Sequence, residues 1–377
     1  MRTMIRSTLS WHLAALICLA CLAPVAAIEQ VTVKQAGLTR ILKGKILVEA
    51  EDGGVLLLTQ DGRLWPLPKE EILSRSSDAK LFQPLTKAEF NKQLLAGLPQ
   101  GFKIHQTKHY SIAYNTSLGY AQWVGALYER LYSAFYVYWP SKGAELKEPE
   151  FPLAAIVFDT RASYEQYART ELGASTATIM GYYSLPTNMV TMYDLTGQEE
   201  SQARISRILS QPNAERNVAT IVHEATHQLA FNSGLQQRFT DTPFWVSEGL
   251  AVYFETPDLD NAKGWKKIGA VNRYNLINFK KYLRNREPGA LSKLLSDDKR
   301  FRDPATQADA YAEAWALNYY LINTHGETYA KYLKVLSAQT PLVMQEPAAR
   351  QEQFLKLFGK SLEELENDFL KYMRSVE

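Results

Sequence analysis

The pattern of hydrophobic and polar positions changes its period several times along the chain. Over residues 28–67, short apolar runs alternate with polar residues, and Asp52-Gly-Gly and Asp61-Gly between them are typical hairpin turns. This period of two predicts a small antiparallel sheet or barrel. A helical pattern follows near 87–95, and residues 105–114 then alternate like a strand that opens a second domain.

The middle of the chain is predicted to alternate helices and strands. Residues 118–139 have the aromatic and apolar spacing of a long helix, and residues 161–171 that of a shorter one. Two short apolar strands are expected at Leu153–Phe158 and Met189–Tyr193. A hairpin-like segment from Met180 leads into the second of them.

An amphipathic helix is expected over residues 218–231, where apolar residues recur every three or four positions. It should stop at Asn232-Ser233-Gly234. After a polar loop, Thr242 and Pro243 are expected as the N-cap and first residue of a second, almost wholly apolar helix that ends at Glu255.

The rest of the chain reads as largely helical. One helix is expected from Tyr311, and a last one opens on the capping box of Ser361 and Glu364. The fold class is therefore α+β: a small β-rich module with its connector over 28–100, a central domain over 101–260, and a helical C-terminal part over 261–377.

The first 27 residues are typical of a secretory signal peptide. Basic residues precede an apolar run over 11–22, and small residues follow up to Ala27, after which we expect cleavage and export to the periplasm or beyond. An uncleaved membrane anchor is the alternative, although the run is short for a membrane span. Lipid attachment at Cys21 is less favoured, because Cys18 stands where a lipobox usually has Leu.

Cleavage after Ala27 would remove both cysteines of the chain, together with Arg2 and Arg6. The chain has 42 basic and 40 acidic residues, so 40 of each would remain. No disulfide could then form, and zero net charge disfavours general nucleic-acid binding. With 46% hydrophobic residues, the chain can bury one large core or two smaller ones.

The expected helix over 218–231 contains His223-Glu-Ala-Thr-His227, which reads H-E-x-x-H. Residues i and i+4 lie on the same face of a helix, so His223 and His227 can bind one metal ion. Zinc suits this geometry, because two imidazoles and a third protein ligand leave a fourth position for water. Zinc lowers the pKa of that water, and Glu224 can accept its proton. The alternative is two ordinary helical histidines and a solvated glutamate.

The best candidate for the third ligand is Glu248. It lies in the middle of the apolar helix over 243–255, where a buried carboxylate without a partner is costly. A cation held by His223 and His227 would remove that cost.

These residues carry a family resemblance. His223-Glu-Ala-Thr-His227, a helix break and then Trp245-Val-Ser-Glu248-Gly-Leu-Ala251 resemble the gluzincin metallopeptidases of the peptidase MA-like group, and most closely their secreted, poorly characterised bacterial members. Gluzincins commonly place the third ligand about twenty residues after H-E-x-x-H, and 20 residues separate His227 from Glu248. The resemblance implies a zincin-like catalytic domain with a mixed sheet, whose cleft the C-terminal part completes. It also implies one Zn²⁺ on His223, His227 and Glu248, with Glu224 as general base.

The sequence departs from better-known gluzincins in two ways. No G-x-M-E-N stretch precedes the motif, so an aminopeptidase that anchors a substrate amino group there is not supported. Val252 stands four residues after Glu248, where some relatives have an Asp that orients a ligand histidine. Glu255 or a backbone carbonyl is the candidate for that role here.

The same resemblance suggests two further parts of a cleft. A strand ahead of the catalytic helix would hold substrate by strand addition, which places Gly181, Tyr182 and Tyr183 near the cleft, although a purely structural hairpin is as good an interpretation. Gluzincins also use a later Tyr or His to stabilise the oxyanion. Tyr311 is our first candidate and His325 the second, and a structural Tyr311 remains the alternative.

Two other features carry weaker signals. His105 and His109 are four residues apart, but on a strand that spacing separates them by about 13 Å, so a metal role is not favoured. Residues 263–286 contain eight basic residues and no acidic one. A solvated helix face is the ordinary interpretation, and contact with an anionic envelope polymer or membrane surface is the functional one.

The sequence therefore predicts a secreted zinc metallopeptidase acting on protein or peptide substrates. One rival is a non-catalytic envelope binding or scaffold protein that retains a metal site. A structural zinc site would have a fourth protein ligand, and the sequence offers no obvious one nearby. The other rival is a zinc hydrolase acting on cell-wall peptides.

Overall fold

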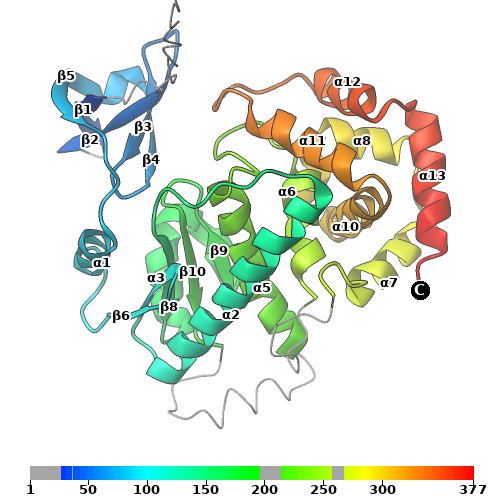
Figure 1. Ribbon diagram of the computed structural model, residues 1–377, viewed down its shortest axis with the longest axis horizontal. Coiled ribbons are helices and arrows are strands. Elements are labelled where there is room, and N and C mark those ends of the chain that lie inside the picture. Colours follow the sequence, from blue (N-terminus) through cyan, green and yellow to red (C-terminus); the bar gives the residue numbers. More distant parts are fainter. Residues whose placement is uncertain (1–26, 36, 196–213, 257–266) are drawn as a thin grey trace, which may run out of the picture.

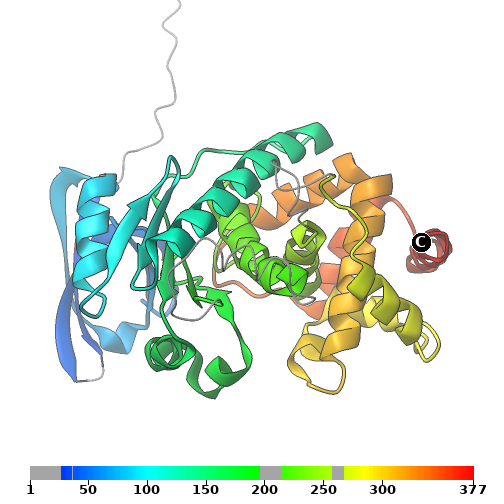
Figure 2. The same ribbon diagram turned by 90° about the horizontal axis from the view of Figure 1, so that it is seen from below.

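The structure is a computed structural model that describes residues 27–35, 37–195, 214–256 and 267–377. It is an α+β protein with an N-terminal antiparallel sheet, a second, mixed sheet and a helical C-terminal part. Figures 1 and 2 show the N-terminal sheet and the C-terminal helices at opposite ends, with the mixed sheet between them. The expected signal peptide, apart from Ala27, lies outside the described residues.

The N-terminal sheet has five antiparallel strands in the order β4-β3-β2-β1-β5. They are β1 (Ala27–Gln35), β2 (Leu38–Glu49), β3 (Val55–Thr59), β4 (Leu64–Leu67) and β5 (Ile72–Leu81). Both predicted hairpin turns are present, with Gly53 and Gly62 at positive φ angles of 88° and 82°. The edge strand β5, which follows the short 3-10 helix Lys69–Glu71, was not predicted, because its mostly polar, exposed side chains give no alternating apolar signal.

The second sheet is mixed and follows α1 (Lys87–Ala96). Its order is β6-β7-β8-β10-β9, with β8 parallel to both β7 and β10 and with antiparallel strands at the two edges. The strands are β6 (Lys103–Gln106), β7 (Tyr110–Tyr114), β8 (Leu153–Phe158), β9 (Gly181–Tyr183) and β10 (Met189–Tyr193).

The prediction of one continuous strand over 105–114 was wrong. Residues 107–109 form the turn of the β6–β7 hairpin, closed by a hydrogen bond from the Thr107 amide to the Tyr110 carbonyl. His109 lies in this turn, and its Nδ1 is 2.6 Å from the Glu129 carboxylate. Neither His105 nor His109 belongs to a group of metal-ligating side chains within the described residues.

Helices cover both faces of the mixed sheet (Figure 1). One face packs against α2 (Leu118–Tyr138) and α5 (Ala214–Asn232), and this core continues into the C-terminal helices. The other face packs against α1 and α3 (Arg161–Leu172). Two short 3-10 helices, Pro140–Lys142 and Gly173–Thr178, follow α2 and α3.

The C-terminal part has seven described helices, which pack with α6 (Phe244–Phe254) around buried aromatic side chains. The seven are α7 (Arg273–Tyr282), α8 (Ala290–Ser296), α9 (Lys299–Arg302), α10 (Gln307–Thr324), α11 (Gly326–Ser337), α12 (Pro347–Phe358) and α13 (Leu362–Arg374). The predicted capping box of Ser361 and Glu364 opens α13. Within the described ranges, no helix combines the length and apolar character that a membrane span requires.

Candidate metal centre

Helix α5 is fixed on the sheet by a buried glutamine. The side-chain amide of Gln228 donates to the Ala154 carbonyl of β8 at 2.9 Å and to the Asn188 carbonyl at 2.8 Å. Asn188 lies in the β9–β10 turn with a φ of 64°, a left-handed conformation that asparagine tolerates better than most residues. Its side chain hydrogen-bonds to Asn232 at the end of α5. The β9–β10 hairpin and α5 are therefore joined at two points.

The three residues predicted as metal ligands come together. The Nε2 atoms of His223 and His227 are 3.0 Å apart, and carboxylate oxygens of Glu248 lie 3.2 Å and 3.6 Å from them. One potential ligand atom from each residue falls within 4.8 Å of the others. Two imidazole nitrogens and a carboxylate oxygen form a donor set that suits Zn²⁺.

The other ring nitrogens of the histidines also have partners. His223 Nδ1 is 2.5 Å from Glu255 Oε1, so Glu255 occupies the orienting role for which the sequence made it a candidate. His227 Nδ1 lies 3.4 Å from the Ser247 hydroxyl. When Nδ1 donates to such a partner, Nε2 is left with the lone pair that binds a metal. These contacts fit a metal site on His223, His227 and Glu248.

The electrostatics of the cluster are dominated by burial and by opposite charges. Burial by itself lowers the pKa of His223, but hydrogen bonds to Glu248 and Glu255 raise this pKa well above its ordinary value. Burial would raise the pKa of Glu248, whereas the charges and hydrogen bonds of His227 and His223 lower it strongly. Glu248 is therefore held as a carboxylate, which is the form that ligates a cation.

Glu224 lies beside the cluster and contacts the edge strand. Its Oε2 accepts a hydrogen bond from the Tyr183 backbone N–H at 2.7 Å. Burial raises the pKa of Glu224, and the neighbouring charges of His223 and His227 oppose that rise. A carboxylate with a raised pKa is suited to accept and return a proton.

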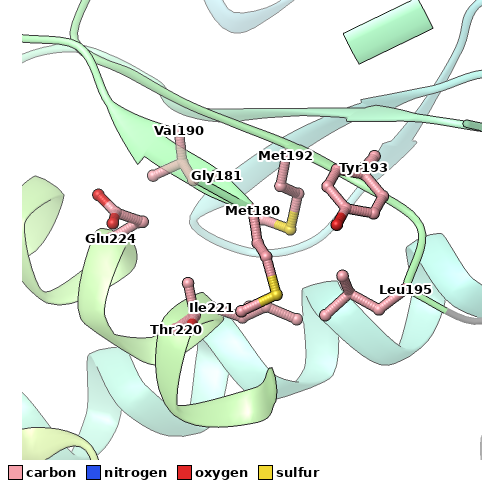
Figure 3. A pocket seen from close by; sticks show the side chains of 9 residues that line it. All are labelled: Met180, Gly181, Val190, Met192, Tyr193, Leu195, Thr220, Ile221 and Glu224. Atoms are coloured by element: carbon pink, nitrogen blue, oxygen red, sulfur yellow. The ribbon is translucent and has the colours of Figure 1, made fainter. Parts of the chain in front are cut away.

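A small cavity borders Glu224 between α5 and the sheet edge. Figure 3 shows Glu224 at one end of it and Tyr193 and Leu195 at the other, with Met180 and Met192 between them. Its volume of about 10 Å³ is room for roughly one water molecule. The apolar walls limit how far solvent can reach Glu224 from this side.

Tyr311, the first candidate for oxyanion stabilisation, meets the cluster from α10. Burial raises the pKa of its phenol well above the ordinary value, and the charge of Glu248 and a hydrogen bond to it raise this pKa further. The hydroxyl therefore stays protonated and can donate. His325 is 14 residues further along, about 21 Å at the helical rise, and its Nδ1 is 2.6 Å from the Thr324 hydroxyl. It does not join the cluster.

The three residues predicted on the edge strand have different surroundings. Gly181 borders the cavity beside Glu224, and the Tyr183 ring stacks on Phe231 of α5 at 5.6 Å. Tyr182 points to the opposite face of the sheet, where it packs in the core with α3 and its hydroxyl donates to Glu171. Side chains alternate between the two faces along a strand, so of these three residues only Gly181 and Tyr183 lie on the side of α5.

Glycine at position 249 allows the helices that carry Glu248 and Tyr311 to cross closely. A Cβ at Gly249 would lie 2.1 Å from the Asn318 amide nitrogen and 2.6 Å from the Ala314 carbonyl oxygen of α10. Asn318 in turn donates to the Trp245 carbonyl at 2.8 Å and accepts a hydrogen bond from the Tyr329 hydroxyl. This buried network sets the spacing between α6 and α10, and sequence reasoning did not find it.

The predicted start of α6 was wrong by one residue. Pro243 is its N-cap, and Thr242 lies outside the helix. The first amide, that of Phe244, instead donates to Asp298 at 2.9 Å, and Arg350 of α12 binds both Asp298 and Asp241. Such a cap comes from a residue distant in sequence, so no local pattern indicates it.

Comparison with protein families matches part of the chain. A family model described as "Protein of unknown function (DUF1570)" matches residues 217–343. No curated protein matches the chain. The matched span runs from α5 to the loop after α11 and contains His223, Glu224, His227, Glu248 and Tyr311. It excludes the N-terminal sheet and the β9 edge strand, and its description assigns no activity.

Proposed function

We propose that this protein is a zinc-dependent metallopeptidase that hydrolyses peptide bonds in protein or peptide substrates. The observation that carries the proposal is the convergence of His223 Nε2, His227 Nε2 and a Glu248 oxygen within 4.8 Å. Glu224 on one side and Tyr311 on the other add the two proton-handling groups that such a reaction needs.

The residues of the site would divide the work as follows. His223, His227 and Glu248 would hold the zinc, and Glu255 would fix the ring of His223. Bound zinc supplies Lewis acidity, which polarises a carbonyl and makes water acidic. Glu224 would take a proton from the attacking water and pass it to the leaving amine. The Tyr311 hydroxyl would donate to the oxyanion of the tetrahedral intermediate.

An open ligand position separates this proposal from a structural metal site. Structural zinc sites have four protein ligands, whereas catalytic sites have three and leave one position for water. Within the described residues, the group of potential ligands has three members, and Glu255 is engaged with the other nitrogen of His223. This arrangement supports a catalytic metal site rather than a structural one in a scaffold protein.

The decisive experiment compares the wild-type protein with Glu224→Gln. Glutamine keeps an acceptor for the Tyr183 amide but cannot take up a proton, so we expect one zinc per chain in both proteins. Hydrolysis of a peptide library should fall about 10²- to 10⁴-fold in the variant. A chelator should abolish the wild-type activity, and added zinc should restore it.

Two results would overturn the proposal. If both proteins bind zinc and neither cleaves any peptide, including cross-linked cell-wall peptides, the metal-holding binding protein replaces the peptidase. If neither protein binds zinc, the assignment of the centre itself is wrong.

A further inference from the structure

Helix α7 presents a continuous exposed face that the proposed peptidase chemistry does not use. Four exposed positions repeat at helical spacing along it, Arg273, Ile277, Lys280 and Lys281, and the exposed Arg284 lies in the turn that follows its last residue, Tyr282. The opposite side of the helix is buried through Leu276 and Phe279, and the Phe279 ring packs 5.5 Å from that of Phe369 on α13. One side of α7 thus packs against the protein core, and the other side faces outward.

This outward face is basic and also apolar. Tyr274 and Ile277 are 61% and 54% exposed. Cationic residues lie on both sides of them along the helix. Among the described residues, Arg273, Lys281 and Arg284 form no ion pair with a carboxylate, and Lys280 donates to the Val376 carbonyl at 2.8 Å.

The basic residues of the stretch over 263–286 differ in their surroundings. Arg286 turns inward, where it is 7% exposed and forms ion pairs with Glu313 at 2.8 Å and Glu366 at 2.6 Å. Lys263 and Lys266 lie outside the described residues. The residues available for an external partner are therefore the cations on the α7 face and the exposed Lys267.

We propose that the outward face of α7 is a docking surface for an anionic lipid membrane. The cations complement negatively charged headgroups, each contributing about a fivefold gain in affinity near a charged surface. The exposed side chains of Tyr274 and Ile277 favour a membrane over a soluble polyanion as the partner. A bilayer interface accepts aromatic and aliphatic side chains, whereas a hydrated polymer offers them little to bury against. The binding is peripheral and reversible, because one short helix buries little apolar area.

The test uses sedimentation of the full-length protein with lipid vesicles. Neutral vesicles of phosphatidylcholine give the baseline affinity. This baseline includes any lipid binding by the apolar segment over 11–22. Vesicles that also contain phosphatidylglycerol should bind the wild type more tightly. The triple variant Arg273→Gln, Lys281→Gln and Arg284→Gln should lose this excess affinity by roughly 100-fold. Ile277→Ser should weaken binding to anionic vesicles without changing the dependence on salt.

A matched control removes three positive charges elsewhere. Lys331→Gln, Lys334→Gln and Lys356→Gln change exposed residues of α11 and α12 and should leave the excess affinity nearly unchanged. The proposal is overturned if the wild type binds both kinds of vesicle equally, or if the control loses as much as the α7 variant. It is equally overturned if the wild type ignores vesicles but binds a soluble polyanion through the same cations. None of these outcomes depends on peptidase activity.

Discussion

At the scale of single residues, the contact between Glu255 and His223 has a clear chemical purpose. A carboxylate 2.5 Å from Nδ1 fixes the orientation of the ring and makes Nε2 a better electron donor. Glu255 follows the last turn of α6, seven residues after Glu248, so the same segment carries one proposed ligand and the partner of another.

Replacing Glu255 with Ala should therefore weaken zinc binding by about 10- to 100-fold. Competition with a chromophoric chelator measures the change directly. Glu287→Ala removes an exposed carboxylate that pairs with Lys293, far along the chain from the site, and it should have no effect on zinc binding. Equal affinities in the wild type and the Glu255 variant would show that His223 does not need this partner.

Tyr311→Phe tests the oxyanion donor in a different way. Removing one such donor typically lowers kcat by about 10²- to 10³-fold, while zinc content and KM should change little. Tyr319→Phe is the matched control, because Tyr319 lies on the same helix and its ring packs against Tyr372. A kcat that falls equally in both variants would assign Tyr311 a packing role only.

At the scale of elements, the close crossing of α6 and α10 determines whether Glu248 and Tyr311 can meet. Gly249→Ala would place a methyl group against the Asn318 amide and the Ala314 carbonyl, so the helices must move apart. Overpacking of this kind costs about 1–3 kcal/mol, which urea denaturation measures, and activity should fall as well.

Gly119→Ala is the control for this prediction. Gly119 lies near the start of α2, and a Cβ there would meet no atom within 4 Å. Because alanine is the better helix former, this variant should be as stable as the wild type or slightly more so. Similar stability in the two variants would mean that α6 and α10 can separate freely.

The element scale also shows what the sequence could predict. The bounds of β8 and β10 match the prediction, because short apolar runs between polar segments are local signals. The helix that carries His223, Glu224 and His227 was predicted because helical spacing is local as well. The polar edge strand β5 and the turn at 107–109 were missed, since neither has a distinctive hydrophobic period. The Asp298 cap and the Tyr183 contact to Glu224 link residues far apart in sequence, which one sequence does not reveal.

At the scale of the whole molecule, Arg238 connects the N-terminal sheet to the edge hairpin of the site. Its guanidinium donates to the Gly62 carbonyl in the β3–β4 turn at 2.8 Å and to the Leu185 carbonyl at 2.9 Å. The Leu64 amide of β4 also donates to Pro186 in the hairpin turn at 2.8 Å. The N-terminal sheet, in which we found no chemical motif, therefore contacts the β9–β10 hairpin. The Tyr183 amide of this hairpin in turn contacts Glu224.

Arg238→Ala should loosen this hairpin, because two carbonyl groups lose charge-assisted hydrogen bonds of about 1.5–3 kcal/mol each. Hydrogen exchange of the β9 and β10 amides should become faster, with little change in the helices of the C-terminal part. The control is Lys45→Ala. It removes the ion pair between Lys45 of the N-terminal sheet and Glu150 outside that sheet, and it should change the exchange of the β9 and β10 amides very little. Unchanged exchange in the Arg238 variant would show that the hairpin is held by α5 alone.

The distribution of the site along the chain has a consequence for how the protein matures. The three proposed metal ligands and Glu255 all lie within residues 223–255, on α5 and α6, which the loop over 233–243 joins. The entropic cost of closing a loop rises only slowly with its length, so this helix pair could hold the proposed ion while the rest of the chain is still folding. Tyr311 and the strand that contacts Glu224 arrive from more distant segments. In the proposed peptidase, metal loading would thus precede catalytic competence, and a nascent chain would not cleave its neighbours before it has folded.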